Sequence, residues 1–150
     1  MELRAVAWDH PDGVRLRAEQ EAEVERRYGV ADAEPGPAPT ASSMTAFVVA
    51  FDGDTGVGCG GLRALDDVHG EVKRMFVSPE HRGKGISKVI LRHLEERARG
   101  LGWERLVLET GELQPEAMGL YEREGYTAIP PFGYYVGNAQ SRCYEKRLTE

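Results

Sequence analysis

One stretch of the chain, Glu71–Ser87 (EVKRMFVSPEHRGKGIS), constrains the fold more than any other. An apolar, strand-like segment ends at Ser78-Pro79, and a basic loop with two glycines leads from there directly into an amphipathic helix. Strand, loop and helix N-terminus in this order bring free backbone N–H groups together, and the helix dipole adds positive potential. The segment therefore predicts an anion site, and its RGKG loop favours a ligand that carries phosphate.

Size and composition are those of one soluble globular domain. The chain has 150 residues, 41% of them hydrophobic and 29% charged, and we expect residues 1–150 to form a single domain. The net charge of −6 argues against nucleic acid as a partner. The N-terminus lacks the apolar core of a signal peptide and no stretch approaches transmembrane length, so we expect a cytoplasmic protein without a membrane partner.

The two cysteines, Cys59 and Cys143, both fall in strand-like segments and lack the spacing of metal ligands. A zinc site is therefore not expected, and buried free thiols are favoured over a disulfide.

Hydrophobic periodicity predicts the element order β-α-β-β-β-α-β-α-β-β. A helix that connects two neighbouring strands requires at least one parallel pair, so we expect a mixed sheet. Loops are expected at Ala31–Ser43, which holds three prolines, and at Pro130–Gly137. The expected strands are Glu2–Trp8, Met44–Asp52, Gly56–Leu65, His69–Val77, Glu104–Thr110, Gly125–Ile129 and Gln140–Leu148, and the expected helices are His10–Tyr28, Gly85–Arg99 and Pro115–Glu124.

Two other phosphate-binding patterns do not apply to this chain. The sequence has no Walker A motif. A Gly-x-Gly-x-x-Gly pattern occurs at Gly56, Gly58 and Gly61, but it lies within an expected strand and is followed by Leu62–Leu65 rather than by a helix. These glycines are predicted to serve a bulge or close packing instead.

A second informative segment is Leu120–Tyr126 (LYEREGY), at the end of the short third helix. The hydroxyl of Tyr121, at the edge of an active site, can give a proton to a leaving group of similar basicity. On periodicity alone, the favoured interpretation is a tyrosine whose ring packs on the sheet while its hydroxyl stays wet.

Taken together, these segments resemble the core of the GNAT superfamily of acyl-CoA-dependent N-acetyltransferases over Glu71–Ile129. Residues 108–117 and 131–133 also resemble a bacterial subgroup of that family. The resemblance implies a mixed α/β (α+β) fold, with a central, mostly antiparallel sheet of about six or seven strands and about three or four flanking helices.

The resemblance also implies how the cosubstrate acetyl-CoA binds, without a metal. The family's loop, Gln/Arg-x-x-Gly-x-Gly/Ala, maps to Arg82, Gly85 and Ser87, where serine replaces the small residue. The strand beside the pantetheine arm maps to Met75, Phe76 and Val77. The backbone amides expected to hold the pyrophosphate of coenzyme A are those of Arg82, Gly83, Lys84, Gly85, Ile86 and Ser87.

For catalysis, the resemblance assigns Tyr121 as the general acid that protonates the departing thiolate. An ammonium acceptor also needs a base, because it has no lone pair at pH 7. We favour Glu71, which stands where a glutamate serves as base in the histone acetyltransferase branch, although a merely solvated glutamate is the alternative. Glu109 is the rival base or an acceptor-binding anion, and His69 is a further candidate, more typical of a surface turn.

The predicted function is transfer of an acetyl group from acetyl-CoA to the primary amine of a small molecule, directly in a ternary complex. Two alternatives stay open: acetylation of protein lysines or N-termini, and a non-catalytic acyl-CoA-binding module. Phe132, Tyr134 and Tyr135 either wall the acceptor pocket or cap the edge of the core. Family analogy suggests a homodimer.

Overall fold

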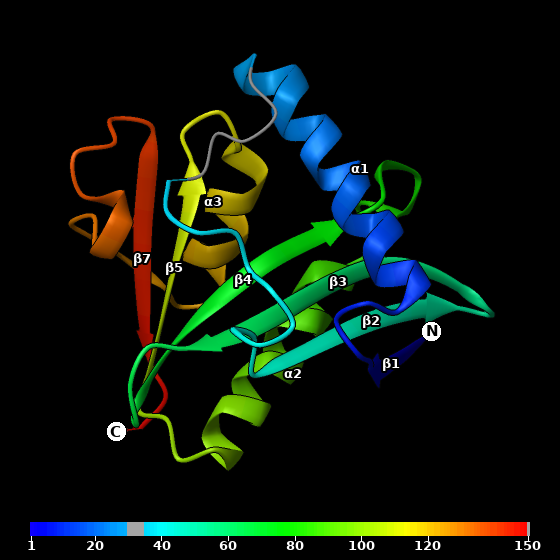
Figure 1. Ribbon diagram of the computed structural model, residues 1–150, viewed down its shortest axis with the longest axis horizontal. Coiled ribbons are helices and arrows are strands. Elements are labelled where there is room, and N and C mark those ends of the chain that lie inside the picture. Colours follow the sequence, from blue (N-terminus) through cyan, green and yellow to red (C-terminus); the bar gives the residue numbers. More distant parts are fainter. Residues whose placement is uncertain (30–34, 150) are drawn as a thin grey trace.

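The computed structural model describes residues 1–29 and 35–149, and in this part of the chain seven strands form one mixed sheet (Figure 1). The strand order is β1-β2-β3-β4-β5-β7-β6. Only β4 and β5 pair in parallel, and all other neighbours are antiparallel. The strands are β1 (Glu2–Ala5), β2 (Ala46–Asp52), β3 (Thr55–Ala64), β4 (His69–Val77), β5 (Arg105–Gly111), β6 (Thr127–Ile129) and β7 (Ser141–Arg147).

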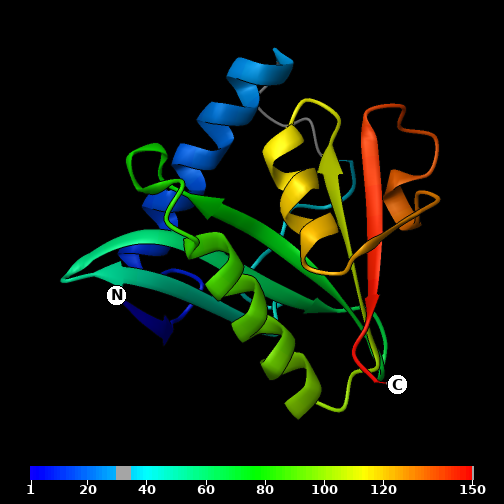
Figure 2. The same ribbon diagram turned by 180° about the vertical axis from the view of Figure 1, so that it is seen from behind.

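Helices cover both faces of the sheet, as comparison of Figures 1 and 2 shows. Helix α1 (Pro11–Tyr28) crosses one face, and α2 (Ile86–Gly100) and α3 (Pro115–Arg123) lie on the other. Two short 3-10 helices, η1 (Pro79–His81) and η2 (Gly133–Tyr135), lie in connecting loops. None of the described helices combines the length and the apolar character needed to cross a bilayer. The architecture confirms the predicted fold and element order.

Element boundaries agree with the sequence predictions to within two residues, apart from the end of the first strand. The expected strand Glu2–Trp8 ends at Ala5, because the chain turns toward α1 and Trp8 packs edge-on against Phe47. The expected strand Gly125–Ile129 begins only at Thr127, because residues 125 and 126 complete the C-terminal turn of α3. Of the expected loop at 31–43, residues 31–34 lie outside the described residues.

The parallel pair is short, and this feature positions the site. Strands β4 and β5 pair only from His69↔Arg105 to Glu71↔Val107. Beyond that point β4 stays paired with β3 and β5 with β7, so the two halves of the sheet diverge. Strand β4 also has a bulge next to this point. Two residues, Arg74 and Met75, lie between Lys73 and Phe76, whereas only one residue separates their partners on β3. Arg74 has a φ of 58°.

The glycines of β3 let neighbouring side chains approach the sheet closely, from α2 at Gly58 and from the segment before β2 at Gly61. A Cβ at Gly58 would lie 3.0 Å from Ile90 Cδ1, and a Cβ at Gly61 would lie 2.5 Å from Met44 Cε. Close packing, rather than dinucleotide binding, therefore accounts for the Gly-x-Gly-x-x-Gly pattern, as predicted. The cysteine prediction is also confirmed, since Cys59 and Cys143 are both buried and free.

Candidate active site

The loop before α2 has the geometry of an anion site. Gly83 and Gly85 both have φ of 78°, a left-handed conformation that glycine adopts without strain. Gly85 caps α2, and a Cβ at either glycine would meet nothing within 4 Å. The first N–H groups of the helix, at Ile86, Ser87 and Lys88, have no acceptor within the helix and lie at the positive end of its dipole. The main chain therefore presents several donors to one open space.

Arg82 braces this loop. Its Nε donates to the carbonyl of Val77 at 2.9 Å, and its Nη2 lies 2.6 Å from Glu23 Oε2 on α1. The guanidinium also lies 5.5 Å from the centre of the Phe76 ring. The Arg82 charge, which we expected to add to the anion site, is thus paired with a carboxylate and ties the loop to β4 and α1.

A cleft of about 480 Å³ runs from this loop toward α3. One wall is β4, through Met75, Phe76 and Val77, and the facing wall is α3, through residues that include Ala117 and Tyr121. The opening between the two sheet halves therefore continues the anion site into an elongated groove. We call this groove the α2–α3 cleft.

A second pocket, of about 350 Å³, lies where β4 and β5 diverge. Charged side chains line it from both strands: Lys73 and Arg74 from β4, and Glu109 from β5. We call it the β4–β5 pocket. It meets the α2–α3 cleft, because both cavities share six lining residues, which are Gln20, Val24, Met75, Gln114, Ala117 and Tyr121.

Tyr121 lies at this junction and is buried, with 5% of its surface exposed. Its ring packs edge-on against Tyr126 and, tilted, against Tyr144, at centroid distances of 5.7 and 6.2 Å. Burial, and to a lesser extent the charge of Glu109, raises the pKa of Tyr121 above its ordinary value. The phenol is therefore neutral near pH 7 and holds a proton that it can donate.

Glu71 is buried behind the pocket, with 1% of its surface exposed, so the interpretation of a solvated strand-start glutamate is wrong. Arg63 Nη2 lies 2.8 Å from its Oε1, and the Tyr135 hydroxyl donates to its Oε2 at 2.7 Å. Lys73 Nζ is 3.6 Å from Oε2. Glu71 lines neither cavity.

Glu109 lies on the same face of the sheet and does line the β4–β5 pocket, together with Tyr121. Its Oε2 accepts a hydrogen bond of 2.7 Å from Ser141 Oγ. Burial raises the pKa of Glu109, so that it binds a proton more readily than an ordinary glutamate. The third base candidate, His69, pairs with Asp66 at 2.8 Å in the turn before β4 and lines neither cavity.

The aromatic residues of the loop before β7, Phe132, Tyr134 and Tyr135, do not wall the β4–β5 pocket, which was the first of the two expectations for them. Asn138 and Gln140 of this region line the β4–β5 pocket, whereas none of its three aromatic side chains does. Tyr135 is buried and holds Glu71, with Phe132 edge-on at 5.1 Å, while Tyr134 is 67% exposed. The alternative, a cap on the edge of the core, fits Phe132 and Tyr135.

Three residues of the site were not found from the sequence. Gln20 donates from Nε2 to the carbonyl of Met75 at 2.9 Å, and within residues 1–29 and 35–149 its buried Oε1 has no hydrogen-bond partner. A signal existed in the sequence, because Gln20 is the polar member of a stripe at helical spacing on α1, formed with Leu16, Val24 and Tyr28. Lys73 and Arg74 gave no such signal: an alternating polar strand residue looks solvated, and a bulge is not visible in composition. No group of three or more potential metal ligands occurs among the described residues.

Comparison with known proteins gives consistent matches. Residues 8–126 match the acetyltransferase (GNAT) family. The uncharacterized N-acetyltransferase YsnE of Bacillus subtilis is 41% identical over 104 residues, which are 68% of this chain and 69% of that protein. A crystal structure from Klebsiella pneumoniae, described as an acyl-CoA N-acyltransferase, superposes with a TM-score of 0.84 and 26% identity, covering 98% of this chain and 97% of the other. A GNAT family acetyltransferase from Elizabethkingia anophelis, with acetyl-CoA bound, has the same fold at 16% identity, with a TM-score of 0.71 over 97% of both chains.

Proposed function

Because the chain belongs to the acetyltransferase (GNAT) family and is an N-acetyltransferase, we propose that it transfers an acetyl group from acetyl-CoA to the primary amine of a small molecule, directly in a ternary complex. One observation carries the proposal: the two cavities meet at Tyr121, through the opening between β4 and β5. The acetyl-CoA bound to the relative from Elizabethkingia anophelis supports the choice of cosubstrate.

The α2–α3 cleft fits acetyl-CoA. Main-chain N–H groups of residues 83–88 would hold its pyrophosphate, and the missing side chains at Gly83 and Gly85 leave room for it. The N–H of Arg82, which was expected to join them, donates instead to the Pro79 carbonyl at 3.3 Å. The backbone of Met75–Val77 lies along the cleft, where it can pair with the pantetheine arm and polarise the thioester carbonyl. When bound, acetyl-CoA supplies the activated acetyl thioester.

The β4–β5 pocket would hold the amine. Glu109 removes a proton from the ammonium group, which is the predominant form of an amine at neutral pH. The freed nitrogen lone pair attacks the carbonyl carbon, so that a C–N bond forms while the C–S bond breaks. Tyr121 gives its proton to the departing sulfur, and the second proton that the nitrogen loses as the amide forms restores the Tyr121 hydroxyl, directly or through water. We assign the base to Glu109 instead of Glu71, because Glu71 is buried behind the pocket and its oxygens are bound by Arg63 and Tyr135.

The size of the pocket favours a small acceptor. Its volume of about 350 Å³ is at the lower end of the range of small-molecule sites, roughly 300–1,000 Å³. A lysine of a folded protein would instead require an open groove on the surface.

The test combines acetyl-CoA binding by calorimetry with release of free thiol in the presence of small amines and short peptides. We expect binding, and thiol release that depends on the small amines. Binding without release from any acceptor would indicate a non-catalytic module, and release with peptides alone would indicate a protein acetyltransferase.

Substitution of Tyr121 tests the proton donor. Tyr121→Phe should lower kcat by about 10²–10⁴-fold, because the thiolate then leaves without an acid, while the Kd for acetyl-CoA changes little. Tyr134→Phe removes a hydroxyl from an exposed tyrosine outside both cavities and serves as the matched control. Full activity of Tyr121→Phe at every pH would refute the assignment.

A further inference from the structure

We propose that the acceptor is a zwitterion of the α-amino acid type, whose carboxylate is bound by Lys73 and Arg74 while its amine faces Glu109 beside Tyr121. The inference rests on the proposed function, since it names the acceptor of the same pocket. It makes Lys73 and Arg74 specificity-determining residues.

The first argument is the distribution of charge around the β4–β5 pocket. Its β4 wall carries two cations, Lys73 and Arg74, and its β5 wall carries the carboxylate of Glu109. The exposed Glu21 of α1 also lines the pocket, so an acceptor with only an ammonium group would engage the acidic side chains but not the two cations of the β4 wall. A ligand with one negative and one positive end matches both walls.

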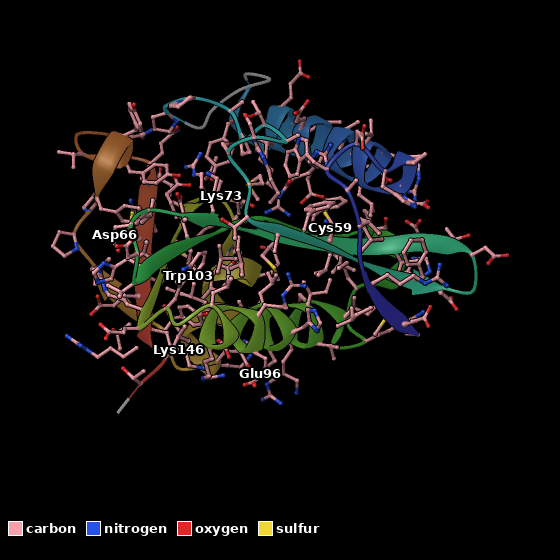
Figure 3. All side chains as sticks on the ribbon, turned by 60° about the horizontal axis from the view of Figure 1, so that its bottom comes forward. Cys59, Asp66, Lys73, Glu96, Trp103 and Lys146 are labelled. Carbon is pink, nitrogen blue, oxygen red and sulfur yellow. The ribbon has the colours of Figure 1, made fainter. Side chains whose placement is uncertain are left out.

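The second argument is the position of Lys73. Its side chain is 5% exposed, although it lines the pocket, and Figure 3 shows it on the α1 side of the sheet, opposite Trp103 and Lys146. Its Nζ donates to the Tyr135 hydroxyl at 2.9 Å and lies 3.6 Å from Glu71 Oε2. These contacts hold the ammonium group at the wall of the pocket, where a charge-assisted hydrogen bond to a ligand carboxylate can form.

The groups behind Lys73 keep it in place. Glu71 is held by Arg63 Nη2 at 2.8 Å and by the Tyr135 hydroxyl at 2.7 Å. Tyr135 thus contacts both Glu71 and Lys73, and it is itself buried. A buried, oriented cation at the wall of a pocket is a specific carboxylate-binding element, whereas an exposed lysine is not.

Burial disfavours the charged forms of both Lys73 and Glu109, and a zwitterionic ligand would offset this effect for both. It lowers the pKa of Lys73 to about 8 and raises the pKa of Glu109. Both charged forms therefore lose hydration in the pocket, even though each group stabilises the charge of the other. A ligand carboxylate beside Lys73 and an ammonium beside Glu109 would compensate both losses, and a simple amine would compensate one.

The connectivity of the ligand then places its nitrogen. In an α-amino acid the carboxylate and the amine are attached to the same carbon. A carboxylate held on the β4 side thus directs the nitrogen across the opening toward Glu109, near the junction at Tyr121. A peptide N-terminus has an amide in place of this carboxylate, so it would lose the contact with Lys73.

The test uses matched pairs of acceptors with the wild-type enzyme and acetyl-CoA. Each proteinogenic α-amino acid is compared with the primary amine that results from its decarboxylation and with its dipeptide amide, and thiol release is measured. We expect at least one amino acid to exceed its decarboxylated partner at least about tenfold in kcat/KM, the effect of one charge-assisted hydrogen bond. Acetylation of amines or dipeptide amides as fast as the amino acids would overturn the inference and leave the proposed function intact.

The remaining outcomes are also decisive. Acetyl-CoA binding without release from any of these acceptors would overturn the inference. Failure to bind acetyl-CoA would instead remove the proposed function on which the inference rests.

Substitutions then locate the carboxylate site. Lys73→Met should reduce the ratio of kcat/KM for the amino acid to kcat/KM for its decarboxylated amine at least about tenfold, mainly through KM. Lys146→Met removes a lysine that pairs with Glu95 of α2 and lines neither cavity, so it should leave the ratio unchanged. If Lys73→Met does not fold, Arg74→Met is measured in the same way. An unchanged ratio in the folded variant would show that the carboxylate binds elsewhere.

Discussion

The α2–α3 cleft and the β4–β5 pocket are adjacent, but they are built from different parts of the chain. The anion site at the end of the cleft is made of main-chain groups from one continuous segment, residues 83–88. The pocket is made of side chains from α1, β4, β5 and the loop that precedes β7. A site of backbone amides depends on the conformation of the main chain, whereas a site of side chains depends on which residue types occupy the positions around it.

The electrostatics of the two regions differ in the same way. Beside the cleft, the Arg82 charge is paired with Glu23, so the helix terminus and the glycine loop provide the positive potential. In the pocket, side chains carry the charge, among them the buried Lys73 and the half-buried Glu109. Under the proposed function, a common cosubstrate would be held by the backbone and a particular acceptor by side chains.

The largest effect is expected in the β4–β5 pocket, which is built from side chains, for the variant Glu109→Gln. It should lower kcat by about 10²–10⁴-fold, because the ammonium acceptor then has no base, while acetyl-CoA still binds. Glu71→Gln is the matched comparison. It should mainly destabilise the fold, by about 3 kcal/mol, because it leaves the Arg63 guanidinium without its buried partner. A stable Glu71→Gln enzyme that has lost catalysis would reverse the assignment; kcat and urea denaturation measure both effects.

The anion site of the α2–α3 cleft, which is built from main-chain groups, should respond to a change of main-chain conformation. Gly85→Val places a β-branched residue at φ of 78° in the anion site and should weaken acetyl-CoA binding by about 100-fold or more in calorimetry. Gly53→Val is the matched control, since Gly53 has φ of 62° in an open turn and lines neither cavity. Both variants should lose about 1–2 kcal/mol of stability. Equal Kd values for the two variants would contradict a site built on this loop.

Stability at alkaline pH tests the burial of Lys73. Its pKa is about 8 in the folded protein and 10.5 ordinarily, so between these values the unfolded chain binds more protons than the folded one. Its contribution to stability is therefore present above pH 10.5 and lost as the pH falls through 8. From pH 8 to 10.5, the unfolding free energy of the wild type should rise relative to that of Lys73→Met by at most about 3 kcal/mol. Parallel curves in urea denaturation would rule out this burial.

The smallest effect is expected from removing the charge of Lys84, beside the anion site. Lys84 is exposed in the glycine loop, and Lys84→Ala should weaken acetyl-CoA binding by less than about fivefold. The loss should diminish at high salt, because the charge is screened. A much larger loss, insensitive to salt, would show that this side chain and not the main chain holds the pyrophosphate.

The two halves also differ in how much could be predicted. The strand, glycine loop and helix of the anion site are contiguous, so local patterns predicted β4 and the start of α2 to within one residue. Local patterns favoured Glu71 over Glu109 as the base, and they do not contain the contacts that reverse this choice. The hydroxyl that holds Glu71 Oε2 belongs to Tyr135, 64 residues further along the chain. The left-handed conformation of Arg74 likewise has no signal in residue type, because it follows from the pairing of β4 with β3.

The brevity of the β4–β5 pairing has a further consequence for the catalytic cycle. Since the sheet is joined at its centre by only three register pairs between β4 and β5, the two cavities meet between its halves while their other lining residues differ. For the proposed reaction, this arrangement would let the two reactants occupy separate cavities at the same time.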